Sequence, residues 1–104
     1  MQKIIKEIVK TLAEKYRPDK VILFGSYAYG KPTEHSDIDL LIIKDTDKRR
    51  VDRFVEIQSI VYEKHCEIPI SPLVLTQKEL QKRINMGDDF IREIVEKGKV
   101  LYEK

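Results

Sequence analysis

Two short apolar runs constrain the fold of this chain more than any other feature. The first, KVILF at residues 20–24, is rich in β-branched side chains and is followed at once by Gly25 and Ser26. The second, DIDLLII at residues 37–43, has an acidic start and an apolar end. Runs of this length and composition are typical of buried strands. We therefore expect two strands of one small sheet, with polar residues where they begin or end.

Apolar residues at every third or fourth position predict two long amphipathic helices, at residues 2–16 and 49–64. In the second helix the apolar positions are Val51, Phe54, Val55, Ile57, Ile60 and Val61. We expect the isoleucine and valine side chains of both helices to form the core. Further elements are expected, in chain order, as a turn or short helix ending near residue 29, a strand at 68–76, helices at 77–85 and 90–97, and a short strand at 99–102.

Capping residues and turn residues mark the ends of the later elements. Thr76 is expected to cap the helix at 77–85, and Asp88 or Asp89 the helix that follows. Gly98 is expected to end that helix, because glycine tolerates the left-handed conformation found there.

Two prolines, Pro69 and Pro72, indicate that the strand at 68–76 lies at a sheet edge or contains a bulge. Helices and strands mix along the chain, so we expect an α/β or α+β fold around a small sheet. A length of 104 residues predicts a single domain over residues 1–104.

Composition excludes several classes of protein. Twenty basic residues nearly balance eighteen acidic ones, and the net charge of +2 gives no reason to expect direct binding to nucleic acid or to an anionic membrane. A single cysteine cannot form an internal disulfide. The sequence contains no run of about 18 apolar residues, so we expect no membrane-spanning helix. Its first residues also lack the apolar core of a signal peptide. We expect a cytoplasmic protein.

Asp37 and Asp39 lie two residues apart in a predicted strand, so their side chains are expected on the same face. Ile38 and Leu40 would then face the core. Two neighbouring carboxylates repel each other unless a cation lies between them. Mg²⁺ fits this need, because it takes oxygen ligands and adds substrate phosphate oxygens to one or two carboxylates.

The Gly25–Ser26 pair is complementary to the two aspartates. Glycine after a strand lets the backbone turn sharply, and Ser26 offers a hydroxyl at the start of a short helix. Helix starts bind phosphate through backbone N–H groups. Taken singly, an Asp-x-Asp is most often a solvated strand end and a Gly-Ser a simple turn. Their combination favours a metal-bound polyphosphate, and therefore phosphoryl or nucleotidyl transfer.

Gly25–Ser26, ten further residues, and then Asp37–Ile38–Asp39 resemble the signature of the minimal nucleotidyltransferases of the DNA polymerase β-like superfamily. The whole string LFGSYAYGKPTEHSDIDLLII resembles that family. The resemblance implies the family's fold, a small mixed β-sheet flanked by helices and similar to the polymerase β palm. A usual arginine of the family is replaced by Tyr27 or Tyr29, as in the subgroup paired with HEPN-domain ribonuclease toxins.

The resemblance also implies roles for these residues. Gly25 and Ser26 would hold the triphosphate of ATP, and Asp37 and Asp39 would bind Mg²⁺ and carry catalysis. AMP would pass from ATP to a tyrosine hydroxyl of a HEPN toxin, which would make the protein a type VII-like antitoxin.

One position departs from the family pattern. The superfamily usually supplies a third carboxylate from a later strand, but IPISPLVLT contains no Asp or Glu, and Ser71 stands at the aligned position. A serine is a weak metal ligand and no useful base at neutral pH. Two alternatives follow. Either Glu67 substitutes, or the protein binds nucleotide with weak or no catalysis and neutralises its partner stoichiometrically. A weaker third reading is a substrate-binding or regulatory domain of a larger transferase.

Several other polar residues are candidates for a role in binding. They are His35 in the loop before Asp37, the neighbours His65 and Cys66, the basic cluster Lys44, Lys48, Arg49 and Arg50, and Lys31 near the expected phosphate site. We expect His35 to be solvated, Cys66 to be a small apolar residue, and Lys31 to be a better phosphate contact than the basic cluster. Tyr27 and Tyr29 are expected to pack, with base stacking or acceptance of AMP as alternatives.

Overall fold

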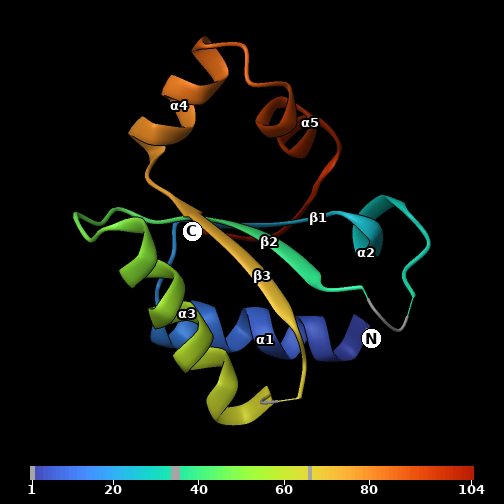
Figure 1. Ribbon diagram of the computed structural model, residues 1–104. Helices are drawn as coiled ribbons and strands as arrows, with labels where there is room; N and C mark the ends of the chain where they lie inside the picture. Colours follow the sequence, from blue (N-terminus) through green and yellow to red (C-terminus); the bar gives the residue numbers. More distant parts are fainter. Residues whose placement is uncertain (1, 34–35, 66) are drawn as a thin grey trace.

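A computed structural model describes residues 2–33, 36–65 and 67–104 (Figure 1). In chain order the elements are α1 (Gln2–Lys15), β1 (Lys20–Phe24), α2 (Ser26–Tyr29), β2 (Ile38–Ile43), α3 (Arg50–His65), β3 (Ile70–Leu75), α4 (Gln77–Asn85), α5 (Asp89–Lys97) and β4 (Lys99–Glu103). The strands form one sheet in the order β3-β2-β1-β4. β1 runs antiparallel to β2 and β4, whereas β2 and β3 are parallel. The predicted mixed sheet flanked by helices is confirmed.

Helices cover both faces of the sheet, and each face has its own apolar core. Figure 1 shows α1 and α3 below the sheet and α4 and α5 above it. Leu40 of β2 packs with Ile8 and Leu12 of α1, while the next residue, Leu41, packs with Ile91 of α5. This alternation follows from the period of two in a strand. Within the described parts of the chain, no helix has both the length and the apolarity to span a bilayer.

β3 lies at the edge of the sheet, as its prolines indicated. It is shorter than predicted, because Pro69 precedes the strand and contributes only its carbonyl oxygen, which accepts a hydrogen bond of 3.1 Å from the Ile38 amide. The register against β2 is unbroken from Ile38–Ile70 onward. The register shift in the sheet lies instead between β1 and β4.

The prediction that the apolar residues of α3 form core is wrong for part of that helix. Ile57 and Val61 are buried, but Val51 and Val55 are 56% and 55% exposed. The face toward the sheet repeats every four residues, and its first position is Arg53, which is 6% exposed. Val51 and Val55 therefore belong to an outward face.

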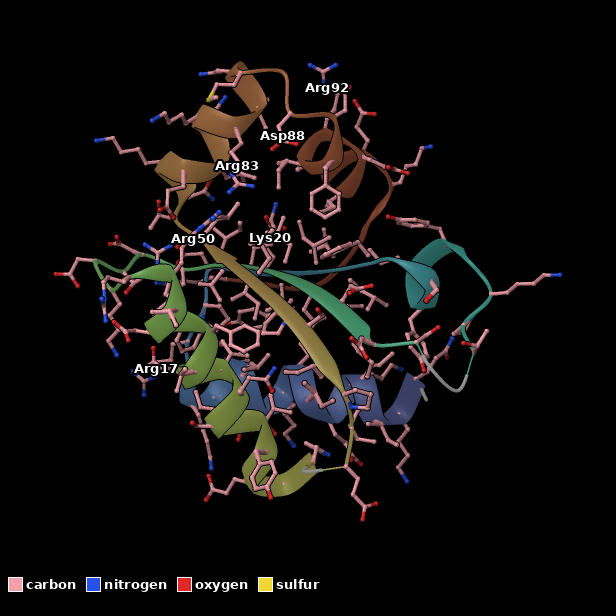
Figure 2. All side chains as sticks on the ribbon, viewed as in Figure 1. Arg17, Lys20, Arg50, Arg83, Asp88 and Arg92 are labelled. Atoms are coloured by element: carbon pink, nitrogen blue, oxygen red, sulfur yellow. The ribbon has the colours of Figure 1, made fainter. Side chains whose placement is uncertain are left out.

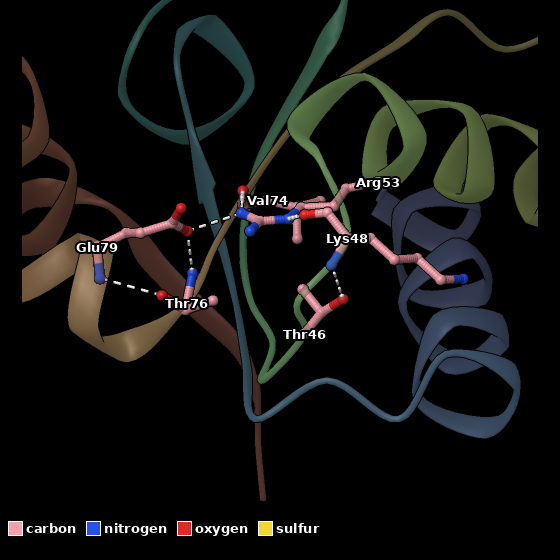
Figure 3. A network of polar contacts seen from close by, with 6 residues as sticks. All are labelled: Thr46, Lys48, Arg53, Val74, Thr76 and Glu79. Carbon is pink, nitrogen blue, oxygen red and sulfur yellow. Dashed lines mark hydrogen bonds and ion pairs between the residues drawn. The ribbon is translucent and has the colours of Figure 1, made fainter.

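Arg53 joins three elements at the end of the sheet where β2 and β3 finish (Figure 3). Its guanidinium donates to the carbonyl oxygens of Lys48 and Val74 at 2.7 and 3.2 Å, and to Oε1 of Glu79 at 2.7 Å. Glu79 also accepts from the Thr76 amide, and the Thr76 hydroxyl accepts from the Glu79 amide. This reciprocal pair is a capping box, so the predicted cap at Thr76 is confirmed.

The helix α5 ends at Lys97 with Gly98 as its C-cap, so the predicted end is confirmed, but the conformation expected for Gly98 is not. Asp88 caps the helix, accepting from the amides of Phe90 and Ile91. Gly98, however, has a φ of −67° and a ψ of 161°, an extended conformation and not a left-handed one. Glycine is needed there for space, since a Cβ would lie 2.6 Å from Cγ2 of Ile22 and would overlap the Ile94 carbonyl.

Candidate functional site

The end of β1 and the start of β2 bring the predicted site residues together. Phe24, the last residue of β1, pairs with Asp39 in the antiparallel register, and Gly25 and Ser26 follow Phe24 directly. The side chains of Phe24 and Asp39 lie on the same face of the sheet, the face covered by α5, because paired residues share a face. Gly25, Ser26 and Asp39 therefore lie at one corner of the sheet.

Gly25 has a backbone conformation that suits glycine alone. Its φ is +75°, and a Cβ there would overlap Oδ2 of Asp39. The backbone can thus approach the carboxylate closely. Ser26 then begins α2, and the amides of Ala28 and Tyr29 donate to the Gly25 carbonyl oxygen. Because α2 has only four residues, its dipole is small, and the Ser26 hydroxyl and the bare Gly25 backbone are what this corner offers to a ligand.

The two aspartates lie close enough to affect each other. β2 begins at Ile38, so Asp37 precedes the strand and is not its first residue as predicted. Burial of Asp39, and secondly the charge of Asp37, raise the pKa of the Asp39 carboxyl above its ordinary value. Ile38 and Leu40, on the opposite face of β2, are fully buried as expected, and they hold in place the strand that carries Asp39. Two carboxylates held together against their repulsion are a donor set suited to a divalent cation such as Mg²⁺.

Asp39 lies between two neighbouring strands, and its partner on β3 is Ser71. The parallel register pairs Asp39 with Ser71, so both lie on the same face, and Ser71 is exposed. Glu67 lies in the turn before β3 and is also exposed. Over residues 2–33, 36–65 and 67–104, no group of three or more His, Cys, Asp or Glu side chains converges on a cation position. At this position β3 presents the Ser71 hydroxyl, and not a carboxylate, beside Asp39.

The basic cluster lies at the other end of β2, away from Asp39. Lys44 follows the last residue of that strand, and its Nζ donates to the Tyr16 carbonyl oxygen at 2.6 Å. Lys48 and Arg49 pair with Glu56 and Asp52 at 3.0 and 3.2 Å. Arg50 points toward α4 and lines a cavity of about 470 Å³ with Lys82 and Arg83 (Figure 2). These cationic side chains therefore lie far from Gly25 and Asp39.

The remaining candidates have different surroundings. Tyr27 packs against the core below the sheet, as expected, whereas Tyr29 is 47% exposed beside the site. Lys31 is exposed in the segment after α2. His65 ends α3, and its carbonyl oxygen accepts from the Ile68 amide. The predictions for His35 and Cys66 fall on positions that lie outside the described residues.

Comparison with known proteins finds relatives that match almost the whole chain. Residues 6–104 match the family model described as "Polymerase beta, Nucleotidyltransferase". A relative from Methanocaldococcus jannaschii, named "Putative protein adenylyltransferase MJ0604", is 41% identical over 103 residues, which cover 97% of each chain.

Two solved structures share the fold. A protein from Sulfolobus solfataricus, described as a "putative nucleotidyltransferase" and solved at 1.40 Å resolution, has a TM-score of 0.68 at 22% identity, covering 100% of this chain and 81% of that one. A mutant of the toxin–antitoxin MntA–HpeT has a TM-score of 0.64 at 18% identity, covering 94% and 72%. Since the family model spans nearly the whole chain and the relative matches end to end, the protein belongs to the polymerase β nucleotidyltransferase family.

Proposed function

We propose that this protein is a Mg²⁺-dependent adenylyltransferase that transfers AMP from ATP to a tyrosine hydroxyl of a HEPN-domain toxin and thereby acts as its antitoxin. The observation that carries the proposal is the approach of the Gly25 backbone to the Asp39 carboxylate, beside Ser26 and Asp37. Family membership supports nucleotidyl transfer. The name of the M. jannaschii relative supports a protein as the acceptor.

Each residue of the corner has a role in this reaction. Asp37 and Asp39 would hold Mg²⁺, which when bound offsets the negative charge of the phosphates. The bare backbone of Gly25 admits the triphosphate, and the Ser26 hydroxyl donates to a phosphate oxygen. The acceptor phenol oxygen forms a bond to the α-phosphorus while the bond from that phosphorus to the bridging oxygen breaks. Pyrophosphate leaves, and the phenol proton passes to a base, for which Glu67 is the nearest carboxylate to β3 in sequence.

One observation supports a toxin as the partner, and a second supports a protein partner in general. The structural neighbour MntA–HpeT is described as a toxin–antitoxin. In addition, the outward face of α3 exposes Phe54, Val55 and Tyr62 by 45%, 55% and 68%, and these residues line a groove of about 560 Å³. Apolar surface of this kind, rimmed by polar residues such as Gln58 and Glu63, is typical of protein–protein contacts.

A second function is favoured by one position. Ser71, and not a carboxylate, lies beside Asp39 on the neighbouring strand. A site with two carboxylates and no neighbouring base can retain nucleotide without turnover. In this alternative the protein silences its partner by stoichiometric binding.

The experiment that separates the two uses ATP labelled at the α-phosphate, added with Mg²⁺ to the protein and a lysate of the host cells. Its control is the double variant Asp37→Ala, Asp39→Ala, whose aspartates face the site and not the core. A labelled protein band that the control lacks supports AMP transfer and gives the size of the acceptor. No band, together with calorimetric binding of ATP and Mg²⁺, supports the stoichiometric inhibitor.

A further inference from the structure

Two aromatic rings, those of Phe24 and Phe90, lie next to the site and were not predicted from the sequence to belong to it. Phe24 pairs with Asp39 and is itself 8% exposed. The ring of Phe90 meets it edge to face, with 5.7 Å between centroids and 81° between planes. Phe90 therefore lies one side chain away from a proposed metal ligand, on the same face of the sheet.

Phe90 is held in place although it is 53% exposed. Its amide donates to the Asp88 carboxylate at 3.1 Å, in the cap of α5. One residue later, Ile91 is fully buried, as is Ile94, so the helix is anchored on the sheet. In Figure 1, α5 lies above the end of β1 that leads into α2. A fixed aromatic ring with half of its surface open, beside a polar site, is a preformed stacking platform.

We propose that Phe90 forms the subsite for the nucleobase, with the base stacking on the exposed part of its ring. This inference rests on the proposed function, since it concerns the nucleotide bound by the same corner. The bound nucleotide would then lie around Phe24. Its phosphates would lie on one side, at Gly25 and Ser26, and its base on the other, at Phe90. Every base has an aromatic face, so such a platform adds affinity for a nucleotide without reading hydrogen bonds.

This arrangement divides the site into two halves. The nucleotide occupies the half built by β1, α2 and α5, around Phe24. On the other side of Asp39 lies Ser71 on the edge strand β3, which is exposed. The acceptor hydroxyl then approaches from the β3 side, where the sheet is open.

The test compares two ligands, ATP and inorganic tripolyphosphate, by calorimetry with Mg²⁺ present. Tripolyphosphate has the phosphates and lacks the base. We expect Phe90→Ala to weaken ATP binding by about 5- to 100-fold and to leave tripolyphosphate binding unchanged. Phe90→Tyr keeps a ring and should bind ATP as the natural protein does. Phe90→Leu keeps an apolar contact with Phe24 and should lose ATP affinity like the alanine variant.

Val95→Ala is the matched control, because Val95 is another apolar residue of α5, is 45% exposed and is not part of the proposed site. It should bind both ligands normally. Unchanged ATP binding in Phe90→Ala and Phe90→Leu would overturn the nucleobase subsite, and so would an equal loss of both ligands. If the natural protein binds neither ATP nor tripolyphosphate, the proposed function fails as well. A loss of AMP transfer with normal ATP binding would assign the ring to the acceptor and overturn the inference.

Discussion

The backbone of Gly25 lies so close to the carboxylate of Asp39 that a Cβ at position 25 would overlap Oδ2. Gly25 follows the last residue of β1, and Asp39 lies in β2, where it pairs with Phe24. This contact links the turn after β1 to the acidic start of β2. Any side chain at position 25 must either displace Asp39 or deform the turn.

We expect Gly25→Ala to lower the free energy of unfolding by about 2–3 kcal/mol, through positive φ and through overlap with Asp39. Gly87 offers a control, since it also has a positive φ, of +78°, but has open space where a Cβ would lie. Gly87→Ala should cost about 1 kcal/mol, the cost of the backbone conformation alone. Urea unfolding measures both. If the overlap matters, the cost of Gly25→Ala shrinks when Asp39→Ala is also present, and equal costs in both backgrounds would contradict the contact.

Asp39→Asn should raise the stability of the protein while it abolishes AMP transfer. Because burial and Asp37 raise the pKa of Asp39 in the folded state, the ionised carboxylate opposes folding at neutral pH. We expect a small gain in the free energy of unfolding at pH 7, because solvent screens a carboxylate that is only partly buried. The gain should disappear as the pH falls below the ordinary pKa of an aspartate, where the unfolded chain is protonated too.

Thermal and urea unfolding at pH 7 and at acidic pH check this prediction. Asp47→Asn is the control, because Asp47 is an exposed aspartate in the loop after β2. It should leave stability nearly unchanged at every pH. A loss of stability in Asp39→Asn would mean that the carboxylate makes a favourable contact that outweighs its burial.

Ser71→Asp tests whether the missing third carboxylate limits the reaction. The register places position 71 directly beside Asp39 on an exposed strand edge, so the new side chain has room. If a metal ligand or base is lacking, the variant should gain AMP transfer, measured with ATP labelled at the α-phosphate. Glu67→Gln in the natural background is the companion measurement. Full loss of activity there, with no gain from Ser71→Asp, would make Glu67 the base.

The Arg53–Glu79 pair should make stability depend on acid pH. The hydrogen bond from Arg53, together with the bond from the Thr76 amide and the charge of Arg53, outweighs burial and lowers the pKa of Glu79 from 4.5 to about 2. The unfolded chain then takes up the proton first as pH falls. The contribution of Glu79 is therefore present above about pH 4.5 and is lost between there and about pH 2.

Glu79→Gln isolates this charge, since glutamine also fits the third position of a capping box. The Glu79 side chain is 39% exposed, so solvent screens the pair, and we expect a loss of only about 1 kcal/mol at pH 7. Near pH 2 the variant and the natural protein should unfold alike. Glu93→Gln, on the exposed side of α5, should show no such difference; the same pH profile in both variants would remove Arg53 from the explanation.

The sequence predicted the elements well because their signals are local. The β-branched run at β1, the period of α1 and the cap at Thr76 each depend on neighbours along the chain. The exposure of Val51 and Val55 could not be predicted, because the angular position of α3 is set by the packing of Ile57 and Val61. Apolar residues with helical spacing occur on both of these faces of α3, so the sequence alone does not tell which face is buried.

The site was only partly accessible from the sequence. Gly25, Ser26 and the aspartates lie together as the motif indicated, although their roles remain predictions. Phe90 was missed because its place depends on α5 folding back over β1, a contact between segments far apart in the chain. Its one local signal was a large aromatic residue in the first turn of a predicted helix, where an exposed position is expected to be polar.

Pro72, in the middle of the edge strand β3, has a consequence for how the protein meets other chains. The pairing with β2 continues through Pro72 opposite Leu40 without interruption, so the missing amide hydrogen falls on the outer side of the strand. A strand from another molecule cannot complete a ladder there. The open edge of the sheet is thereby protected against aggregation, and a protein that approaches Ser71 has to recognise side chains and not the backbone.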